Sequence, residues 1–425
     1  MQNSALTKRV VIGLGSNQEA LINLRRALLE LRRISQFKIL KVSRIYESVA
    51  QLPVNAPLDW DQAYLNAAIL IEVQNFDPLK LLDQLKVLEV RIGRVTTEKW
   101  APRIIDLDIL HVDDLRFKTE NLTIPHPMLA QRPFAFLPAL EVEPGMPLIR
   151  KNDQDYNTKI SDRFFWPEFV GILNVTPDSF SDGGKYLERD NFLIQARKLV
   201  VAGADYLDIG AESTRPSAKP VSLVDELNRL KGALDHLEEL RQEGFKFKIS
   251  IDSRHYETIL KVTENYKIDL INDVSGLTDD RILKLIKSQA LSAVCMHSLS
   301  VPARKDLVLN SESNPVEQIQ NWWLQKEKLF ASHDIHEKNI FFDPGFGFGK
   351  TVEQNQYLVE HLEDFVKIQN KFFIGYSRKS FLGTATDRDM TTAQITHRIN
   401  PAVSQLLRVH DIETQKSALR MPHAI

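Results

Sequence analysis

Two aspartates separated by one residue are the first group in the sequence that could do chemistry. Asp106 and Asp108 lie in the apolar run 104–110, which reads as a β-strand. The two-residue period of a strand directs both carboxylates to one face. Neighbouring hard oxygen ligands suit Mg²⁺ that holds nucleotide phosphates. The same spacing also suits the polar outer face of a half-exposed strand, so the pair alone leaves both interpretations open.

Basic residues on either side of this pair favour phosphate chemistry. They are Arg94, Lys99, Arg103, His126 and Arg132. Guanidinium groups complement phosphate oxygens in bidentate geometry. Metal-binding carboxylates and arginines together are what phosphoryl transfer from ATP requires. We therefore predict a site for Mg²⁺ and ATP in the first third of the chain.

Polar residues recur at the ends of short apolar segments after residue 168. The segments are 169–173, 206–209, 248–251, 270–271, 292–296, 339–342, 372–376 and 406–409. The polar residues at their ends are Asn174, Asp208, Asp252, Asn272, His297, Asp343, Ser377 and Arg408. Eight strands over about 250 residues fit a closed (β/α)8 barrel. An open doubly wound sheet is the alternative, but it would gather such residues mainly at its switch point, whereas a barrel brings all eight ends around one mouth.

Two glycine-rich segments come close to nucleotide-binding loops and fail their patterns. Gly13–Asn17 lacks the third glycine of a dinucleotide fingerprint, because the next residue is Gln18. Gly345–Thr351 ends in Gly-Lys-Thr, but Pro344 stands where a P-loop needs its first glycine. We expect these later glycines to permit a tight turn at the barrel mouth.

The pattern of elements divides the chain into two domains. Strand candidates in the first domain are 10–14, 38–46, 66–73 and 104–112, and helix candidates are 19–34 and 78–92. Strands and helices do not alternate strictly there, which favours an α+β, ferredoxin-like domain with an antiparallel sheet over residues 1–143. Residues 144–168 are polar and aperiodic and read as a linker. Residues 169–425 are then the α/β TIM barrel.

Composition restricts the class of protein. With 54 Lys and Arg against 56 Asp and Glu, the net charge is −2, so we expect no nucleic-acid partner. No apolar stretch approaches the ~18 residues that cross a membrane, and the chain reaches its first strand without room for a signal peptide. The single cysteine, Cys295, permits no intrachain disulfide and indicates a reducing compartment. We expect a soluble, cytoplasmic enzyme.

Four segments of the first domain together resemble hydroxymethyl-dihydropterin pyrophosphokinase. They are Gly13–Asn17, Tyr64–Ala68, Pro102–Asp108 and Pro125–Pro127. The resemblance covers about residues 10–143 and implies that Asp106 and Asp108 hold two Mg²⁺ with ATP. It implies these further roles: catalysis by Arg94, Arg103 and Asp108, pterin binding by Tyr64, Asn66 and Phe134, and ATP binding by Arg94, Lys99, Arg103, His126 and Arg132. Thr96 departs from relatives that carry another basic residue at this place.

Five segments of the second domain resemble dihydropteroate synthase. They are Asn174–Gly184, Asp208–Pro216, Asp343–Lys350, Ser377–Ser380 and Arg408–Asp411, within about residues 169–415. The resemblance implies a pterin site at Asp252, Asn272, Asp343 and Lys379, a pyrophosphate site at Asn174, Arg408 and His410, and a p-aminobenzoate site at Phe180, Pro216 and Ser380. Asp208, Thr214, Arg215 and Met296 complete the implied substrate contacts. Lys379 and Asp252 are the implied catalytic residues, and Asn174 is the implied ligand of one Mg²⁺ bound with pyrophosphate. Segment 297–302 lacks a glycine common in relatives.

Together the resemblances imply a bifunctional folate-biosynthesis enzyme. Its first reaction transfers pyrophosphate from ATP to 6-hydroxymethyl-7,8-dihydropterin, and its second condenses the product with p-aminobenzoate to dihydropteroate and pyrophosphate. The expected partners are these small molecules and a second copy of the chain, in a homodimer through the barrel domain. The alternatives are a non-catalytic pterin-binding scaffold and a barrel enzyme acting on another phosphorylated substrate. Retention of Arg103, Asp106, Lys379 and Arg408 argues against a decayed scaffold.

Overall fold

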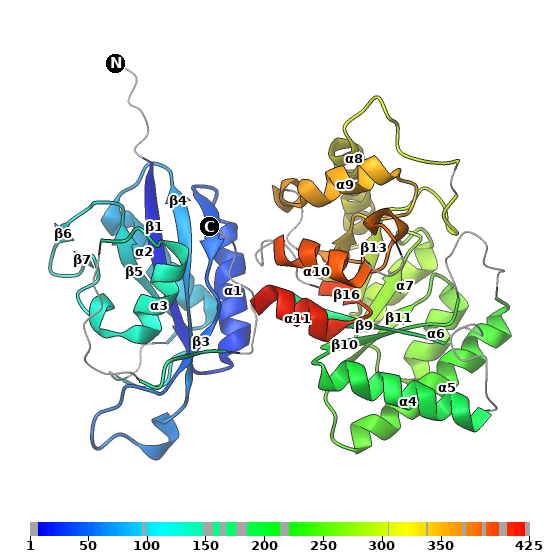
Figure 1. Ribbon diagram of the computed structural model, residues 1–425, viewed down its shortest axis with the longest axis horizontal. Helices are drawn as coiled ribbons and strands as arrows, with labels where there is room; N and C mark the ends of the chain where they lie inside the picture. The colour runs from blue at the N-terminus through cyan, green and yellow to red at the C-terminus, as the bar shows by residue number, and fades with distance from the viewer. Residues whose placement is uncertain are drawn as a thin grey trace. The chain divides into compact units, whose positions relative to one another are not determined.

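The computed structural model describes most of the chain. The described residues are 7–95, 98, 100–147, 156–161, 167–175, 185–212, 221–304, 306–336, 339–367, 371–384, 388–398 and 406–420. The chain divides into two compact units, Met1–Trp166 and Pro167–Ile425, which Figure 1 draws in blue to cyan and in green to red. Each unit has a sheet and a core of its own, so each is described by itself.

The first unit is an antiparallel sheet covered by helices. Its main elements are β1 (Lys8–Ser16), α1 (Ala20–Arg32), β2 (Phe37–Val42), β3 (Tyr46–Ser48), β4 (Tyr64–Val73), α2 (Pro78–Ile92), β5 (Asp106–Val112), α3 (Pro133–Val142) and β8 (Lys159–Ile160), with a hairpin of β6 (Phe117–Lys118) and β7 (Thr123–Ile124). The strand order is β5-β1-β4-β3-β8, and β2 also pairs with β4. The predicted α+β fold with an antiparallel sheet is confirmed. The one strand predicted over 38–46 is wrong: the chain forms β2 and β3, separated at Ser43, whose hydroxyl accepts the N–H of Ala68.

Both faces of this sheet are buried, which explains the long apolar run of β4. Val11, Leu70 and Leu110 pack against Phe136 and its neighbours on α3. The residues that alternate with them, such as Val10, are buried as well, because α1 and α2 pack together and contact β1 and β5. A strand covered on both faces carries apolar side chains at successive positions, whereas a half-exposed strand alternates.

Helix α2 ends where the first candidate site begins. Its N-cap Asp77 accepts hydrogen bonds from the N–H groups of Leu79 and Lys80, and Pro78 occupies the first turn. At the other end Gly93 adopts a φ of 119°, the left-handed conformation that stops a helix. The chain therefore leaves the helix immediately before Arg94.

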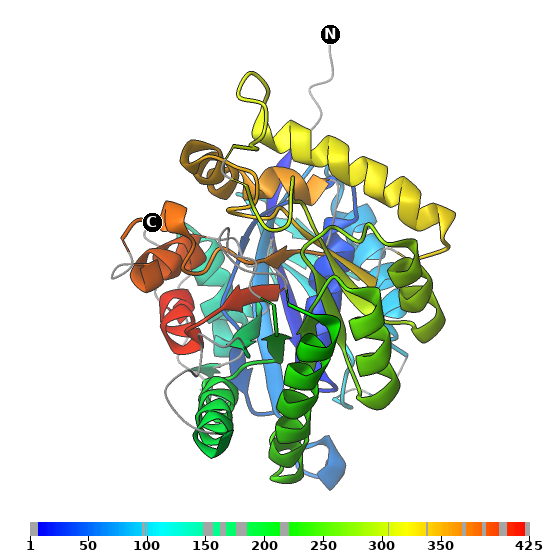
Figure 2. The ribbon, with the colours of Figure 1, turned by 90° about the vertical axis from the view of Figure 1, so that its right-hand side faces the viewer.

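The second unit is a closed parallel barrel. Its strands are β9 (Glu168–Asn174), β10 (Tyr206–Gly210), β11 (Lys248–Asp252), β12 (Leu270–Asp273), β13 (Ser292–Met296), β14 (Ile340–Asp343), β15 (Phe373–Ile374) and β16 (Leu406–Val409). Its helices are α4 (Lys185–Val201), α5 (Leu223–Gln242), α6 (Tyr256–Asn265), α7 (Asp280–Gln289), α8 (Pro315–Ser332), α9 (Val352–Glu360), α10 (Arg388–Arg398) and α11 (Ile412–Arg420). The eight strands pair in the order β14-β13-β12-β11-β10-β9-β16-β15, and a parallel bridge from Phe342 to Phe372 joins the two ends. Figures 1 and 2 show the helices outside the strands. The (β/α)8 prediction is confirmed, and the open sheet is excluded.

An apolar layer fills the barrel two residues before the polar carboxyl ends of its strands. Residues from seven strands form one buried cluster, and they are Val170, Tyr206, Leu270, Val294, Phe341, Phe373 and Leu406. Two residues further along most of these strands stand polar residues, for example Asp208 after Tyr206 and Arg408 after Leu406. Side chains two residues apart point to the same face of a strand. The cluster therefore forms a floor under the polar groups at the carboxyl ends.

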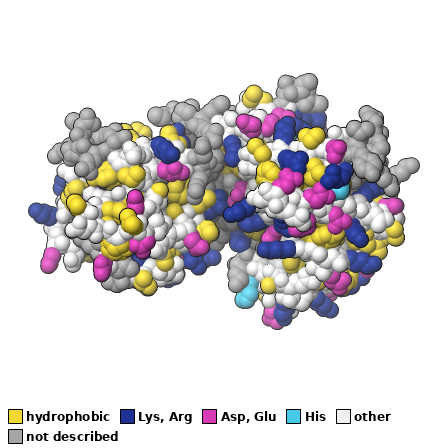
Figure 3. Space-filling model, turned by 90° about the horizontal axis from the view of Figure 1, so that it is seen from below, with side chains coloured by type: hydrophobic (Ala, Val, Ile, Leu, Met, Phe, Trp, Pro, Cys, Tyr) yellow, Lys and Arg dark blue, Asp and Glu magenta, His cyan; other side chains and the backbone are white. Residues whose placement is uncertain are grey.

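The surface shows no expanse of one charge on the face in Figure 3, where basic and acidic side chains are interspersed. This agrees with the net charge of −2. Within the described part of the chain, no helix combines the length and the apolar character needed to cross a membrane.

Candidate active sites

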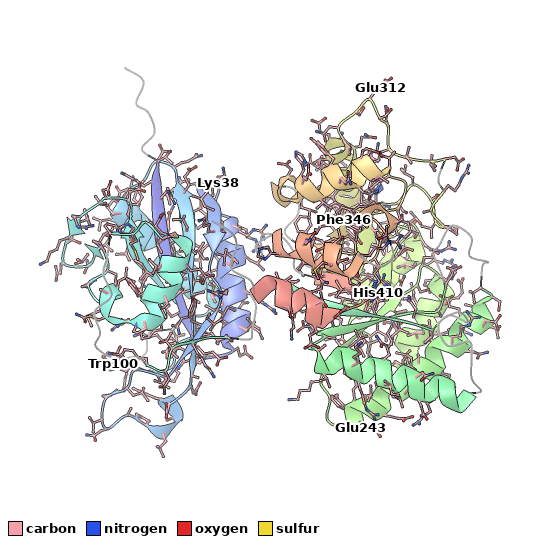
Figure 4. All side chains as sticks on the ribbon, viewed as in Figure 1. Lys38, Trp100, Glu243, Glu312, Phe346 and His410 are labelled. Atoms are coloured by element: carbon pink, nitrogen blue, oxygen red, sulfur yellow. The ribbon has the colours of Figure 1, made fainter. Side chains whose placement is uncertain are left out.

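The first unit contains a cavity of about 410 Å³ around the acidic pair. Eight of the predicted site residues line it, and they are Tyr64, Asn66, Arg94, Arg103, Asp106, Asp108, Arg132 and Phe134. Trp100, which Figure 4 labels, also lines the cavity. His126 is not among the lining residues, and Lys99 lies outside the described residues.

Strand geometry turns both aspartates into this cavity. Asp106 and Asp108 are two residues apart on β5, and Leu107 between them is fully buried. Across the sheet, Asp106 faces Gly15 and Asp108 faces Gly13 on β1. Residues directly opposite on antiparallel strands point to the same side. A Cβ atom at Gly13 would lie 2.9 Å from Leu110, so this glycine permits close packing, whereas a Cβ atom at Gly15 would come no nearer than 3.5 Å to Asn66.

Two arginines hold Asp106. Its carboxylate oxygens lie 2.6 Å from Nη1 of Arg94 and 2.7 Å from Nη1 of Arg103. Burial opposes ionisation, but the two guanidinium groups hold the pKa of Asp106 below its usual value. Burial, with the negative charge of Asp106, raises the pKa of Asp108 to about 6. A half-buried pair of carboxylates that resists carrying a double negative charge is a donor set that fits a divalent cation.

The backbone that carries Arg103 is held by the end of β1. Asn17 accepts the N–H of Arg103 through Oδ1 at 2.7 Å and donates its own N–H to the carbonyl of Arg103 at 3.2 Å. The hydroxyl of Ser16 donates to the carbonyl of Ile104 at 2.5 Å. Ser16 and Asn17 therefore position the arginine-bearing segment, a role that no local sequence signal predicted.

Glu89 on α2 is a second residue that the sequence did not single out. Its side chain is 2% exposed. It accepts the N–H of Leu107 at 2.7 Å and lies 2.6 Å from Nη1 of Arg94 and 2.8 Å from Nζ of Lys86. It therefore links α2 to the strand between the two aspartates. Glu89 follows Leu85 by one helical turn, within the buried stripe of α2, and an acidic residue in an apolar stripe was the available signal.

The aromatic end of the cavity surrounds Asn66. The amide nitrogen of Asn66 donates to Oγ of Ser48 at 3.0 Å and to the carbonyl of Tyr46 at 3.5 Å. Its carbonyl oxygen is then left to accept a hydrogen bond from a ligand. The ring of Phe134, on the cavity wall, meets the ring of Tyr156 edge to face at 5.2 Å. Flat, partly apolar molecules with polar edges fit such a pocket.

His126 and Arg132 follow β7. Nδ1 of His126 accepts the N–H of Met128 at 3.3 Å, which makes Nε2 the protonated nitrogen of the neutral ring. Burial lowers the pKa of His126. Nε of Arg132 is buried without a hydrogen-bond partner among the described residues. Such a donor is available to a bound anion, since a buried polar group is costly when it is left unpaired.

The barrel site is built around Arg408. Its Nε lies 2.6 Å from Oδ2 of Asp208, and its Nη2 lies 2.7 Å from Oδ2 of Asp252. Asp208 is fully buried and also accepts from Oγ of Ser250 at 2.5 Å and Nδ2 of Asn272 at 3.2 Å. Strands β10, β11, β12 and β16 thus meet in one polar network, as the prediction of a shared mouth requires.

Asp343 and Lys379 belong to the same mouth. Oδ1 of Asp343 accepts the N–H of Gly345 at 2.7 Å. Burial raises the pKa of Asp343 to about 6 and that of Asp252 to about 7. Burial, reinforced by Arg408, lowers the pKa of Lys379 to about 8. Perturbed ionisable groups gathered in one place are typical of functional sites.

His410 joins the network from the last strand end. The ring nitrogen Nδ1 of His410 lies 3.0 Å from Oγ of Ser377, and the backbone N–H of His410 donates to the same hydroxyl at 3.3 Å. Burial, with the positive charges of Arg378 and Arg408, lowers the pKa of His410 to about 3. His410 is therefore neutral near pH 7. Figure 4 labels His410 and Phe346 within the barrel unit.

The remaining predicted barrel residues fall into two groups. Met296 is buried with Val274 and Phe348, Ser380 begins a short 3₁₀ helix after Lys379, and Asn174 is exposed at the end of β9. The other predicted residues lie outside the described residues, and they are Phe180, Thr214, Arg215 and Pro216. The described barrel site is therefore the pterin and anion side of the prediction.

Known proteins resemble the chain along its whole length. A model of 7,8-dihydro-6-hydroxymethylpterin-pyrophosphokinase matches residues 11–144, and a model of pterin binding enzymes matches residues 170–410. The folate synthesis bifunctional protein of Chlamydia trachomatis is 32% identical over 438 residues, covering 96% of each chain. Folic acid synthesis protein fol1 of Schizosaccharomyces pombe is 32% identical over 450 residues, and the match spans 99% of this chain and 60% of that protein. Wild-type HPPK-DHPS of Plasmodium falciparum, solved with pterin and p-hydroxybenzoate, shares the fold with a TM-score of 0.55 and 23% identity, over 99% of this chain and 96% of that one.

Proposed function

This chain belongs to the family of bifunctional folate-synthesis proteins, and we propose that its two units carry the two activities at the residues described above. It is a transferase that acts as a hydroxymethyl-dihydropterin pyrophosphokinase and as a dihydropteroate synthase. The first activity belongs to about residues 1–143 and the second to about residues 169–425, with residues 144–168 between them. The proteins of both families generally need Mg²⁺.

In the first unit, the hydroxymethyl oxygen of the pterin attacks the β-phosphorus of ATP, and AMP leaves. Asn66 accepts from the pterin ring, and Tyr64 and Phe134 enclose it. Asp106 and Asp108 would hold two Mg²⁺, which neutralise phosphate charge. Arg94 and Arg103 exchange Asp106 for phosphate oxygens when ATP binds, because a polyphosphate is the stronger anion. The ATP contacts are completed by Lys99, His126 and Arg132.

In the barrel, carboxylate and amide groups bind the donor edge of the pterin ring. Asp252, Asn272 and Asp343 are these groups, and the negative charge of the two carboxylates stabilises the cation that forms when pyrophosphate leaves. Arg408 and His410 receive the leaving anion, and Asn174 would hold one Mg²⁺ with it. The amine of p-aminobenzoate then attacks the pterin methylene beside Lys379. No side chain acts as a nucleophile in this scheme.

The remaining substrate contacts complete the proposal. Phe180, Pro216 and Ser380 bind p-aminobenzoate, and Asp208, Thr214, Arg215 and Met296 shape the pterin and anion sites. A homodimer through the barrel and a cytoplasmic location also stay predictions. Sedimentation analysis of the pure protein tests the dimer.

One observation supports the proposal above all. A single chain assembles an arginine-flanked pair of aspartates in one unit and an arginine-centred carboxylate network in the other. A scaffold protein has no need to keep both sets intact, so the non-catalytic alternative is not favoured.

One assay tests the function. The chain is incubated with MgATP, hydroxymethyl-dihydropterin and p-aminobenzoate, and AMP and dihydropteroate are measured. Both products are expected. A control without ATP but with pyrophosphorylated pterin should give dihydropteroate alone. Thermal shifts with sugar phosphates in place of pterins test the alternative barrel enzyme, which predicts stabilisation by the sugar phosphates and no dihydropteroate.

A further inference from the structure

The loop after β14 wraps around the ammonium group of its own last residue, Lys350. Nζ of Lys350 lies 2.8 Å from the carbonyl of Gly345, 2.9 Å from the carbonyl of Phe348 and 3.0 Å from Nδ1 of His297. The carbonyl of His297 lies further away, at 3.5 Å. Two of these contacts are within the loop, and the third joins the loop to the end of β13.

The contacts use the full donor capacity of the ammonium group. A lysine ammonium has three N–H donors, and three acceptors lie within 3.0 Å of it. The residue is only 8% exposed, and burial lowers the pKa of its ammonium group to about 7. These acceptors, rather than water, satisfy its donors. His297 is an acceptor here, since burial and the charge of Lys350 hold the pKa of its ring well below the usual value. Lys350 is therefore not free to bind a phosphate, which explains physically why the P-loop pattern fails.

Three of the six residues in this loop are glycines, so Phe346, Phe348 and Lys350 are its only side chains. Gly345 and Gly349 adopt φ values of 69° and 66°. A Cβ atom at Gly345 would lie 1.9 Å from the carbonyl oxygen of His297, so only glycine fits against β13. Polar contacts fix the loop together with the buried rings of Phe346 and Phe348. Lys350 is one polar anchor, and Asn355 is another, because its Oδ1 accepts the N–H of Gly347 at 2.8 Å.

The fixed loop supports Lys379 on one side. The ammonium group of Lys379 lies 4.4 Å from the centroid of the Phe348 ring, a cation–π contact. A Cβ atom at Gly347 would lie 3.3 Å from Cδ of Lys379, so the loop backbone adjoins the lysine stem. Phe346 packs against Tyr376 and Phe381, which flank Lys379 in sequence. A shift of the loop would therefore shift Lys379.

We propose that Lys350 is a positioning residue of the synthase reaction, which acts by holding the 345–350 loop under Lys379. The proposal rests on the role proposed above for Lys379 at the barrel site. Lys350 itself touches no substrate, because its donors point into the loop and toward His297. Misplacing a reacting group by about 1 Å can cost about a hundredfold in rate, so a clamp of this kind has a measurable effect on turnover.

A double-mutant cycle on the full chain tests the proposal. Lys350→Met, Lys379→Ala and the double variant are compared with the wild type for kcat and KM of dihydropteroate formation from pyrophosphorylated pterin. Lys350→Met should lower kcat/KM by about ten- to a hundredfold. The double variant should match Lys379→Ala within about twofold, because a residue that acts only through Lys379 has nothing left to position. The melting temperature of the barrel unit reports that each variant is folded, because the first unit has a core of its own and could stay active beside an unfolded barrel.

Lys287→Met is the matched control, since Lys287 is an exposed lysine on α7 paired with Asp334, and it should keep full synthase activity. The proposal would be overturned if the double variant lost activity by the product of the two single losses. Near-normal activity of Lys350→Met would overturn it as well. Should Lys350→Met not fold, Phe348→Leu replaces it in the same cycle, because it removes the ring beneath Lys379 and leaves the clamp. Full synthase activity of Lys379→Ala alone would refute the role of Lys379 itself, and the positioning role with it.

Discussion

The two sites hold their charges in different ways. In the first unit, Arg94 and Arg103 meet Asp106 at the wall of an open cavity, and all three side chains are about a quarter exposed. In the barrel, Arg408 is 19% exposed and lies between Asp208, which is fully buried, and Asp252, which is 13% exposed. Exposed pairs are weak and can exchange partners, whereas buried pairs resist separation. We therefore expect the ion pairs of the first site to change partners when ATP binds. The ion pairs of the barrel site should keep their geometry when substrate binds.

The two sites also differ in how far apart in the sequence their charged residues lie. The ionic cluster of the first site comes from one stretch, residues 89–108, and its members are Glu89, Arg94, Arg103, Asp106 and Asp108. The barrel network draws on four strands between residues 208 and 408. A local site can be altered without disturbing the fold, but a site made of strand ends also holds the barrel together. The following changes test this contrast.

Asp106→Ala should have the largest effect on activity. It removes half of the proposed metal anchor and the partner of both arginines, so AMP formation should fall by at least about a thousandfold. Dihydropteroate formation from supplied pyrophosphorylated pterin should stay normal, and so should the melting temperature. Near-normal AMP production would remove the metal assignment.

Arg408→Ala should act on both activity and stability. It leaves Asp208 and Asp252 buried without their cation, so the free energy of unfolding of the barrel should fall by about 3–5 kcal/mol. Dihydropteroate formation should fall at least about a hundredfold, while AMP formation persists. Denaturant unfolding and both assays measure this. An Arg408 variant with unchanged stability would show that the buried network is not a structural element of the barrel.

The local site was also the easier one to predict from sequence. Asp106 and Asp108 stand two residues apart on a recognisable strand, and the polar residues at eight apolar segment ends predicted the barrel mouth. The roles of Glu89 and Lys350 were not predicted. Glu89 contacts Leu107 and Lys350 contacts His297, and no spacing along the chain encodes these contacts. The division of 38–46 into two strands depends likewise on Ser43, whose side chain bonds to a neighbouring strand.

The barrel site should lose affinity for its pterin substrate as the pH falls. Burial raises the pKa of Asp343 to about 6 and that of Asp252 to about 7. An ionised carboxylate accepts hydrogen bonds from ring donors more strongly than a protonated one, which also presents an O–H donor. KM should therefore rise at least about tenfold between pH 7 and pH 5. Asp343→Asn should weaken this dependence. A KM that does not change over this range would contradict the assignment of these carboxylates.

Acid unfolding would not imitate this result. The folded-state pKa of Asp343 lies above its unfolded value, so the folded barrel binds this proton more tightly than the unfolded chain does. The contribution of Asp343 to stability therefore increases as the pH falls from about 6 toward 4. Substrate affinity should therefore fall with pH while the contribution of this residue to stability rises. Melting temperatures recorded at each pH separate the two.

Glu89→Gln should have a smaller effect, confined to the first unit. The amide oxygen still accepts the N–H of Leu107, but the charge that attracts Arg94 and Lys86 is lost. We expect AMP formation to fall about three- to tenfold, as for the loss of one charge-assisted contact. Glu120→Gln, at an exposed glutamate of the same unit, is the control. An equal loss in both variants would show that Glu89 has no special role.

Separating the two units into two chains should change the two activities least of all. We expect the pyrophosphorylated pterin to escape to solvent between the sites, because tethering concentrates one unit near the other but does not retain a released small molecule. Separate chains should then keep their activities, provided that the cut respects the fold. Residues Lys159–Ile160 pair with β3, and Tyr156 packs on Phe134. A cut after residue 166 preserves these contacts, whereas a cut after residue 155 removes a sheet strand and the ring that packs on Phe134.

An isotope-dilution experiment on the intact chain decides the question directly. Labelled hydroxymethyl-dihydropterin is converted while excess unlabelled pyrophosphorylated pterin is present. Free exchange dilutes the label in dihydropteroate to the ratio of the bulk solution, because diffusion away from a site is much faster than typical turnover of about 10 s⁻¹. Label persisting well above that ratio would demonstrate transfer between the sites without release. In that case the intermediate would pass directly from the first site to the barrel site, and the two units would not act as separate enzymes.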